Sequence, residues 1–136
     1  MLRRIFLIAV ILLAAQNSFA ARSFFNRGAD LYVPQPRLIS PVTEVVNLAG
    51  QDKLIFKWST VEGNTFKRSY YDFRLYKGYD MLESTLILKK QVPPLQGELT
   101  LDASIFENGQ IYTWSLRQKY ISAKSEKSWQ SFKVIK

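Results

Sequence analysis

The chain has 136 residues and a formal net charge of +8, but it contains no cysteine and no histidine. A chain of this length suits a single domain. The missing histidine removes the usual general base, the Ser-His-Asp triad and the commonest zinc ligand. The missing cysteine removes thiol catalysis, disulfides and iron–sulfur sites. Composition therefore disfavours most familiar enzyme classes, and the stability of the chain must come from its core.

The first 20 residues have the pattern of a secretory signal peptide. Arg3 and Arg4 precede the apolar run Ile5–Ala15, and Ser18 and Ala20 place small residues before a cleavage point. The apolar run is shorter than the roughly 20 residues that a spanning helix needs. We therefore expect cleavage after Ala20, with retention as a membrane anchor as the alternative. The exported chain would carry a side-chain charge of +6 (8 − 2), and we expect it in the periplasm or outside the cell, with outer-membrane association as a further option.

The remainder divides into a tail and one domain. Residues 21–36 mix prolines, charges and bulky apolar residues without a period, which predicts a tail or linker lying partly against the domain. Residues 37–136 contain short alternating segments separated by turn residues, with no amphipathic helix period. The expected strands are Leu38–Ser40, Lys53–Ser59, Tyr70–Lys77, Thr85–Gln91, Glu98–Leu101, Gln110–Lys119 and Trp129–Ile135. A single helical turn is expected within Asp102–Phe106.

Gln110–Lys119 is the strand around which this fold is organised. Its alternation places Tyr112, Trp114 and Leu116 on a buried face, and Thr113, Ser115 and Arg117 on a face expected to be wet. Tyr112 stands where immunoglobulin-like sandwiches have a corner tyrosine whose hydroxyl bonds back to the backbone. The same alternation predicts these further inward residues: Leu54, Phe56, Trp58, Tyr71, Phe73, Leu75, Phe132 and Val134. The predicted fold class is all-β.

Several segments together resemble a bacterial fibronectin type III domain over residues 37–136. They are Pro36–Pro41, Phe56–Ser59, Tyr71–Leu75, Leu101 with Tyr112 and Trp114, and Ser128-Trp129 with Phe132 and Val134. A serine precedes Trp129, where many members of the family have one after the tryptophan. The resemblance implies a seven-stranded antiparallel β-sandwich of the immunoglobulin-like type. It also implies a spacer or binding module, and it supplies no catalytic motif.

The motifs of common enzymes are missing from the sequence. There is no Ser-x-x-Lys, no Gly-x-Ser-x-Gly and no glycine-rich phosphate loop. Acidic residues are scattered, so neither a glycosidase pair nor a metal site is indicated. We expect no catalytic residue, no cofactor and no bound metal, and we keep as a less favoured alternative an enzyme whose carboxylates converge only after folding.

Two groups of residues are candidate contact sites. Tyr70, Tyr76 and Tyr79 are expected to be exposed, and contiguous exposed aromatics mark contact surfaces, although a few surface tyrosines are also ordinary. Six cationic residues are candidate anion or partner contacts at one end of the sandwich: Lys67, Arg68, Lys89, Lys90, Lys124 and Lys127. The opposite end would hold Asp52, Asp80, Glu83 and Glu107. The simpler interpretation, that charged loops keep the domain soluble, is favoured.

The function predicted from these patterns is an exported, non-enzymatic binding or structural module of the cell envelope or exterior. The expected partner is an envelope protein. The alternatives are binding to an anionic glycan or lipid through the basic end, and service as an accessory domain of a carbohydrate-active system. No nucleic-acid partner is expected. Strand addition at the first or last strand is disfavoured by Pro41, Lys133 and Lys136.

Overall fold

The computed structural model describes residues 32–60 and 68–136. The predicted signal peptide, residues 21–31 of the predicted tail and Lys67 lie outside the described residues. The described part contains nine strands in two sheets and two short 3₁₀ helices, η1 (Glu83–Thr85) and η2 (Ala103–Ile105). The all-β prediction is confirmed. No helix in the described ranges is long and apolar enough to cross a bilayer.

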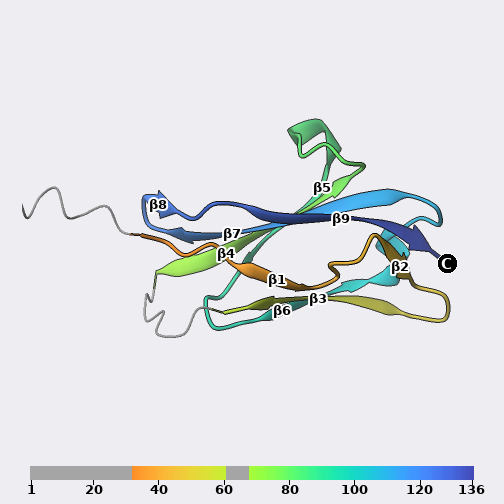
Figure 1. Cartoon of the computed structure of the whole chain (residues 1–136), viewed down its shortest axis with the longest axis horizontal. Coiled ribbons are helices and arrows are strands. Elements are labelled where there is room, and N and C mark those ends of the chain that lie inside the picture. The colour runs from red at the N-terminus through yellow and green to blue at the C-terminus, as the bar shows by residue number, and fades with distance from the viewer. Residues whose placement is uncertain (1–31, 61–67) are drawn as a thin grey trace, which may run out of the picture. The chain divides into compact units, whose positions relative to one another are not determined.

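The smaller sheet has three antiparallel strands in the order β1-β3-β6 (Figure 1). These are β1 (Arg37–Ser40), β3 (Lys53–Ser59) and β6 (Glu98–Asp102). In β3 every second residue is buried, as a strand with one face on a core requires. The strands predicted around residues 38–40, 53–59 and 98–101 are therefore confirmed to within one residue.

The larger sheet is built on the strand predicted at residues 110–119. Its order is β2-β9-β7-β4-β5, and β8 pairs with the end of β7 (Figure 1). The pairs are antiparallel except that between β2 and β9, which is parallel. The strands are β2 (Val45–Asn47), β4 (Ser69–Lys77), β5 (Leu86–Val92), β7 (Ile111–Tyr120), β8 (Ala123–Lys124) and β9 (Ser128–Ile135).

The core lies between the two sheets, and every residue predicted to point inward is buried. Phe56 of β3 is at its centre, with its ring centroid 5.1 Å from those of both Phe73 and Trp114. Both contacts are edge-on, the geometry that the aromatic quadrupole favours. The Trp114 indole also donates a hydrogen bond of 3.0 Å to the carbonyl of Pro41, which ties β7 to the end of β1.

Tyr112 has the corner role predicted for it. Its hydroxyl oxygen accepts a hydrogen bond of 2.8 Å from the backbone N–H of Glu107, at the turn that leads into β7. Its ring meets that of Phe106 edge-on, with the centroids 5.0 Å apart. The predicted helical turn is η2, where the Asp102 side chain accepts from the backbone N–H of Ser104. The Tyr112 side chain thus fixes the turn that leads into β7, the longest strand.

The strand β2 was not predicted, and it changes which strands form the edges. After Pro41 the chain crosses from the smaller sheet to the larger one and pairs with β9, where Val46 lies opposite Val134. A three-residue strand is too short to show an alternating pattern in the sequence. The last long strand is therefore not an edge strand, and the prediction that Lys133 protects an open edge was wrong.

Candidate functional site

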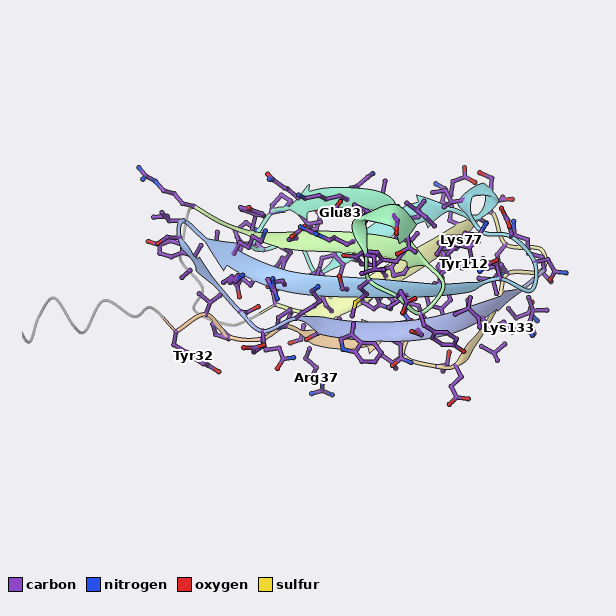
Figure 2. All side chains as sticks on the ribbon, turned by 90° about the horizontal axis from the view of Figure 1, so that it is seen from above. Tyr32, Arg37, Lys77, Glu83, Tyr112 and Lys133 are labelled. Carbon is purple, nitrogen blue, oxygen red and sulfur yellow. The ribbon has the colours of Figure 1, made fainter. Side chains whose placement is uncertain are left out.

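The side of the larger sheet that faces away from the core is the candidate site, and we call it the outer face. On β7 its residues are Thr113, Ser115, Arg117 and Lys119, which alternate with the core residues. Neighbouring residues come from β4 and β9, and Figure 2 shows these strands side by side. Two features of this face could contact a ligand: a groove bordered by aromatic rings and a cluster of cations.

The first feature is a groove of about 530 Å³, which we call the aromatic groove. Two exposed rings line it, Trp129 of β9 and Tyr79 of the β4–β5 connection, with exposed fractions of 57% and 67%. Ile111 and Val45 add aliphatic surface, and Glu44 and Lys133 add one charge of each sign. Apolar walls with a few polar groups are the usual composition of a binding site.

Hydrogen bonds hold the loop that carries Tyr79. Gly78 has a positive φ of 87°, and its N–H donates to the carbonyl of Ile111 at 2.7 Å. The Thr113 hydroxyl donates to the carbonyl of Gly78 at 2.8 Å, so the Ser131 hydroxyl, 2.6 Å away, donates to Thr113. The sequence Gly78-Tyr79 therefore sets the position of one aromatic wall relative to β7 and β9.

The tyrosine predictions had mixed outcomes. Tyr79 is exposed as predicted, and Tyr70 is half-buried. The prediction for Tyr76 was wrong, because only 2% of this residue is accessible. It points away from the core, but β4 is an inner strand flanked by β5 and β7, and the β4–β5 connection with η1 rises over this side of the sheet (Figure 1).

Trp129 is the residue that the sequence interpretation missed. The alternation was used to place Phe132 and Val134 inward, and the same alternation places Trp129, Ser131 and Lys133 on the opposite side. An outward tryptophan next to outward polar residues was therefore readable from the sequence. What the sequence could not show is that Tyr79, fifty residues earlier, lines the same groove.

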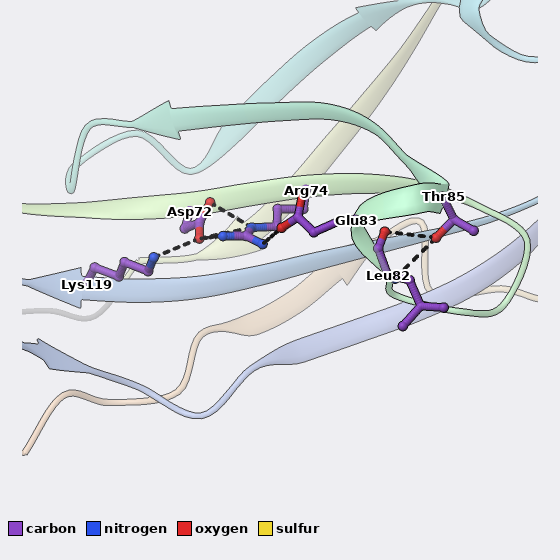
Figure 3. Close-up of polar contacts among 6 residues, drawn as sticks. All are labelled: Asp72, Arg74, Leu82, Glu83, Thr85 and Lys119. Carbon is purple, nitrogen blue, oxygen red and sulfur yellow. Dashed lines mark hydrogen bonds and ion pairs between the residues drawn. The ribbon is translucent and has the colours of Figure 1, made fainter.

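The second feature is built around Asp72, and we call it the cationic cluster: Arg74, Arg117, Lys119 and Lys127. Asp72 is only 4% exposed. Its carboxylate lies 3.1 Å from Nη2 of Arg74 and 3.1 Å from Nζ of Lys119 (Figure 3). The exposed Glu83 of η1 approaches the other side of Arg74 at 3.8 Å. Glu83 was predicted at the far end of the sandwich, whereas η1 places it over the outer face.

These contacts set the charge states of the cluster. Burial tends to raise the pKa of Asp72, but hydrogen bonds from Arg74 and Lys119 outweigh it and leave this pKa below its usual value. The hydrogen bond to Asp72 raises the pKa of Arg74. For Lys127, burial and then the nearby charge of Arg117 lower the pKa. Asp72 is therefore ionised at neutral pH, while Lys127 carries its charge in an unfavourable environment.

Arg117 lies opposite Asp72 in the strand register, yet no ion pair joins the two. Its Nε is buried and has no hydrogen-bond partner within the described part of the chain. Asp72 forms ion pairs with Arg74 and Lys119, whereas no ion pair joins Arg117 or Lys127 to a carboxylate among the described residues. The cluster holds four cations against two carboxylates, an excess of +2 (4 − 2).

The basic end predicted from the sequence is distributed differently. Arg68 is exposed just before β4, whose first residue pairs with Tyr120, and Lys124 pairs with Lys119, so both lie near the end of β7. Lys89 and Lys90 instead lie within the edge strand β5, where they pair with Arg74 and Phe73. Lys127 is half-buried next to the outer face.

Among the described residues, no group of three acidic side chains could hold a metal ion.

Comparison with known proteins gives the fold. The chain is similar to the solved structure of the fibronectin type III domain of the human collagen alpha-1(XX) chain. The similarity has a TM-score of 0.51 and 19% sequence identity, and it covers 79% of this chain and 90% of that domain. A scan of protein-family models and a search of curated proteins returned no match. The fold is therefore a fibronectin type III-like sandwich, an architecture commonly used for binding or structural modules.

Proposed function

We propose that this chain is an exported, non-catalytic module that binds a protein partner through the aromatic groove. The observation that carries the proposal is the pair of exposed rings, Trp129 and Tyr79, that line one groove. Tryptophan and tyrosine are enriched among the residues that dominate interface energies. The core does not need either ring, since both lie outside the buried cluster.

The contacts that hold the groove residues in place favour a binding role over incidental exposure of the two rings. Gly78, Thr113 and Ser131 hold the Tyr79 loop through hydrogen bonds, and Trp129 stands on a paired strand. Little backbone entropy would then be lost when a partner binds, which is the advantage of a preorganised site. The signal-peptide pattern at residues 1–20 supports export. Its test is the mass of the chain recovered from the envelope fraction, which should correspond to a start at Ala21.

The binding test compares three forms of the protein purified from cells that express the full chain. These are the natural sequence, the double variant Tyr79→Ala and Trp129→Ala, and the control Leu95→Ala. Leu95 is 82% exposed and lies between β5 and β6, outside the groove. A partner cross-linked to the natural chain and to the control should be lost from the double variant. With the purified partner, affinity should fall more than tenfold, about 1.4 kcal/mol. Equal affinity for all three forms would contradict the proposal.

A glycan is the second candidate ligand, and the lining of the groove favours it over an anionic lipid surface. Aromatic faces pack against the apolar faces of sugar rings, and Glu44, Ser131 and Lys133 provide hydrogen-bonding groups beside them. In that case the chain would be a glycan-binding protein or an accessory domain of a carbohydrate-active system. A neutral oligosaccharide that changes the Trp129 fluorescence, with no protein captured, would favour this candidate.

A further inference from the structure

The aromatic groove and the cationic cluster share strand β7, because Ile111 lines the groove and Arg117 and Lys119 belong to the cluster. Trp129 pairs with Ser115, and Arg117 is the next outward residue along β7. Along β9 the groove is lined from Trp129 to Lys133, so the middle of that stretch is Ser131, which pairs with Thr113 of β7. Thr113 and Arg117 are four positions apart, which is about 13 Å at 3.3 Å per position. A single extended segment of a partner could therefore reach both features.

We propose that the ligand of the outer face is an extended acidic peptide segment of the partner protein. An apolar side chain would occupy the aromatic groove, and a carboxylate about four positions away would bind Arg117 and Lys127. In an extended chain, residues four positions apart point to the same side, so both groups could face the sheet. This inference rests on the proposed function and specifies the chemistry of the partner.

Charge is the first argument for a carboxylate. Asp72 forms ion pairs with Arg74 and Lys119, and no ion pair joins Arg117 or Lys127 to a described carboxylate. Burying cations without an anion is unfavourable, and a planar guanidinium binds a carboxylate through two parallel hydrogen bonds. A ligand carboxylate that contacts the accessible part of the Arg117 guanidinium would compensate the excess charge. Burial and then the charge of Arg117 lower the pKa of Lys127, which agrees with a surface where an added anion would be favourable.

Shape is the argument for a peptide over a membrane surface. The β4–β5 connection with η1 rises over the outer face, and Glu83 approaches Arg74 from that side (Figures 1 and 3). Arg117 and Lys127 are both half-buried. A flat anionic bilayer would meet η1 and its negative charge before these cations, whereas a single extended chain is thin enough to lie beside it.

The test is a titration followed by the backbone amide signals of the isotope-labelled protein. The probe is a seven-residue synthetic peptide with leucine at its second position and glutamate at its sixth. It should shift the signals of residues 115–119 and 127–131, and the shifts should weaken with added salt because the charges are partly exposed. A peptide with glutamine in place of the glutamate should bind at least fivefold more weakly.

Two single variants complete the test. Lys127→Ser should weaken binding of the glutamate peptide at least fivefold. The matched control Lys90→Ser removes the same charge from the β5 edge and should bind as the natural chain does. Removing Lys127 relieves repulsion with Arg117, so this variant should fold, and its thermal unfolding is recorded beside the titration. Equal binding by the two variants would overturn the inference.

The remaining outcomes separate this inference from the proposed function. If both peptides shift the groove signals equally, the acidic contact is wrong while the groove still binds. If heparin or phosphatidylglycerol vesicles shift residues 115–131 and the glutamate peptide does not, the ligand is not a peptide. If Tyr79→Ala with Trp129→Ala also leaves capture of the natural partner intact, the proposed function fails together with the inference.

Discussion

Replacing Asp72 by asparagine should destabilise the protein at neutral pH. The carboxylate is 4% exposed, and it lies 3.1 Å from both Arg74 and Lys119. Asparagine has nearly the same shape but no charge, so it can replace neither charge-assisted hydrogen bond in full. Two cations on the outer face would then have one fewer carboxylate between them.

The expected cost is about 2–3 kcal/mol in the free energy of unfolding. Breaking a fully buried pair costs about 3–5 kcal/mol, and hydrogen bonds to charged groups contribute about 1.5–3 kcal/mol each. The Arg74 and Lys119 side chains retain 22% and 27% of their exposure, so water can partly replace Asp72. That places the estimate below the fully buried range. For a domain of this size the melting temperature should fall by about 10 °C.

The difference in unfolding free energy between the natural protein and Asp72→Asn should become smaller as the pH falls. The pKa of Asp72 is lowered in the folded state, while the unfolded value is about 3.9. The stabilisation is therefore fully present above the unfolded pKa and is lost as the pH falls through the folded pKa. Urea unfolding at several pH values should show the full difference from about pH 5 to 7 and a shrinking difference below about pH 4.

Asp80→Asn is the matched control, because Asp80 is exposed and its side chain has no ion pair in the described structure. It should change the unfolding free energy by less than about 0.5 kcal/mol. A loss of less than about 0.5 kcal/mol for Asp72→Asn would refute the reasoning. So would a difference that stays constant down to about pH 2, since an unionised Asp72 cannot hold two cations by charge.

Three further substitutions have expected effects on urea or thermal unfolding. Tyr112→Phe leaves the Glu107 N–H without its acceptor and should cost about 1–2 kcal/mol; an unchanged midpoint would mean that the corner bond contributes nothing. Gly109→Ala places a side chain at a φ of 80° and should cost about 1 kcal/mol through the backbone alone, since no atom lies within 4 Å of the added methyl group. Trp129→Ala should cost less than about 0.5 kcal/mol and remove the solvent-exposed part of the tryptophan emission, because Trp58 and Trp114 are buried; a loss above about 2 kcal/mol would make Trp129 a core residue.

The core was predictable because it depends on local alternation. Phe56 and Trp114 each belong to a set of alternate residues that point to one side of a strand. Both strands are long enough to show this period of two, and both residues are buried as expected. The strand β2 was not predictable, because three residues carry no period and its pairing with β9 joins segments nearly ninety residues apart. Glu83 was misplaced for a related reason, since a loop's return onto a sheet is set by tertiary contacts.

The outer face shows why the alternation of side chains along a strand does not by itself identify a binding surface. Thr113 and Ser115 were predicted to lie on a wet face, and both point away from the core, yet each is buried. They are covered because β7 lies between β4 and β9 and because the Gly78 loop bonds to Thr113. Tyr76 and Asp72 are buried on the same side. Much of this side of the sheet is therefore buried, although it faces away from the core.

The burial of these residues limits where on the outer face a partner could gain binding free energy. A side chain already buried within the chain has little surface left to remove from water, so it contributes little to association. Trp129 and Tyr79 retain large apolar areas, and Arg117 and Lys127 have no ion pair with a described carboxylate. These four residues occupy one side of one sheet, within the reach of a single extended segment. Under the proposed function, binding energy from the outer face should therefore come from the groove and from Arg117 and Lys127.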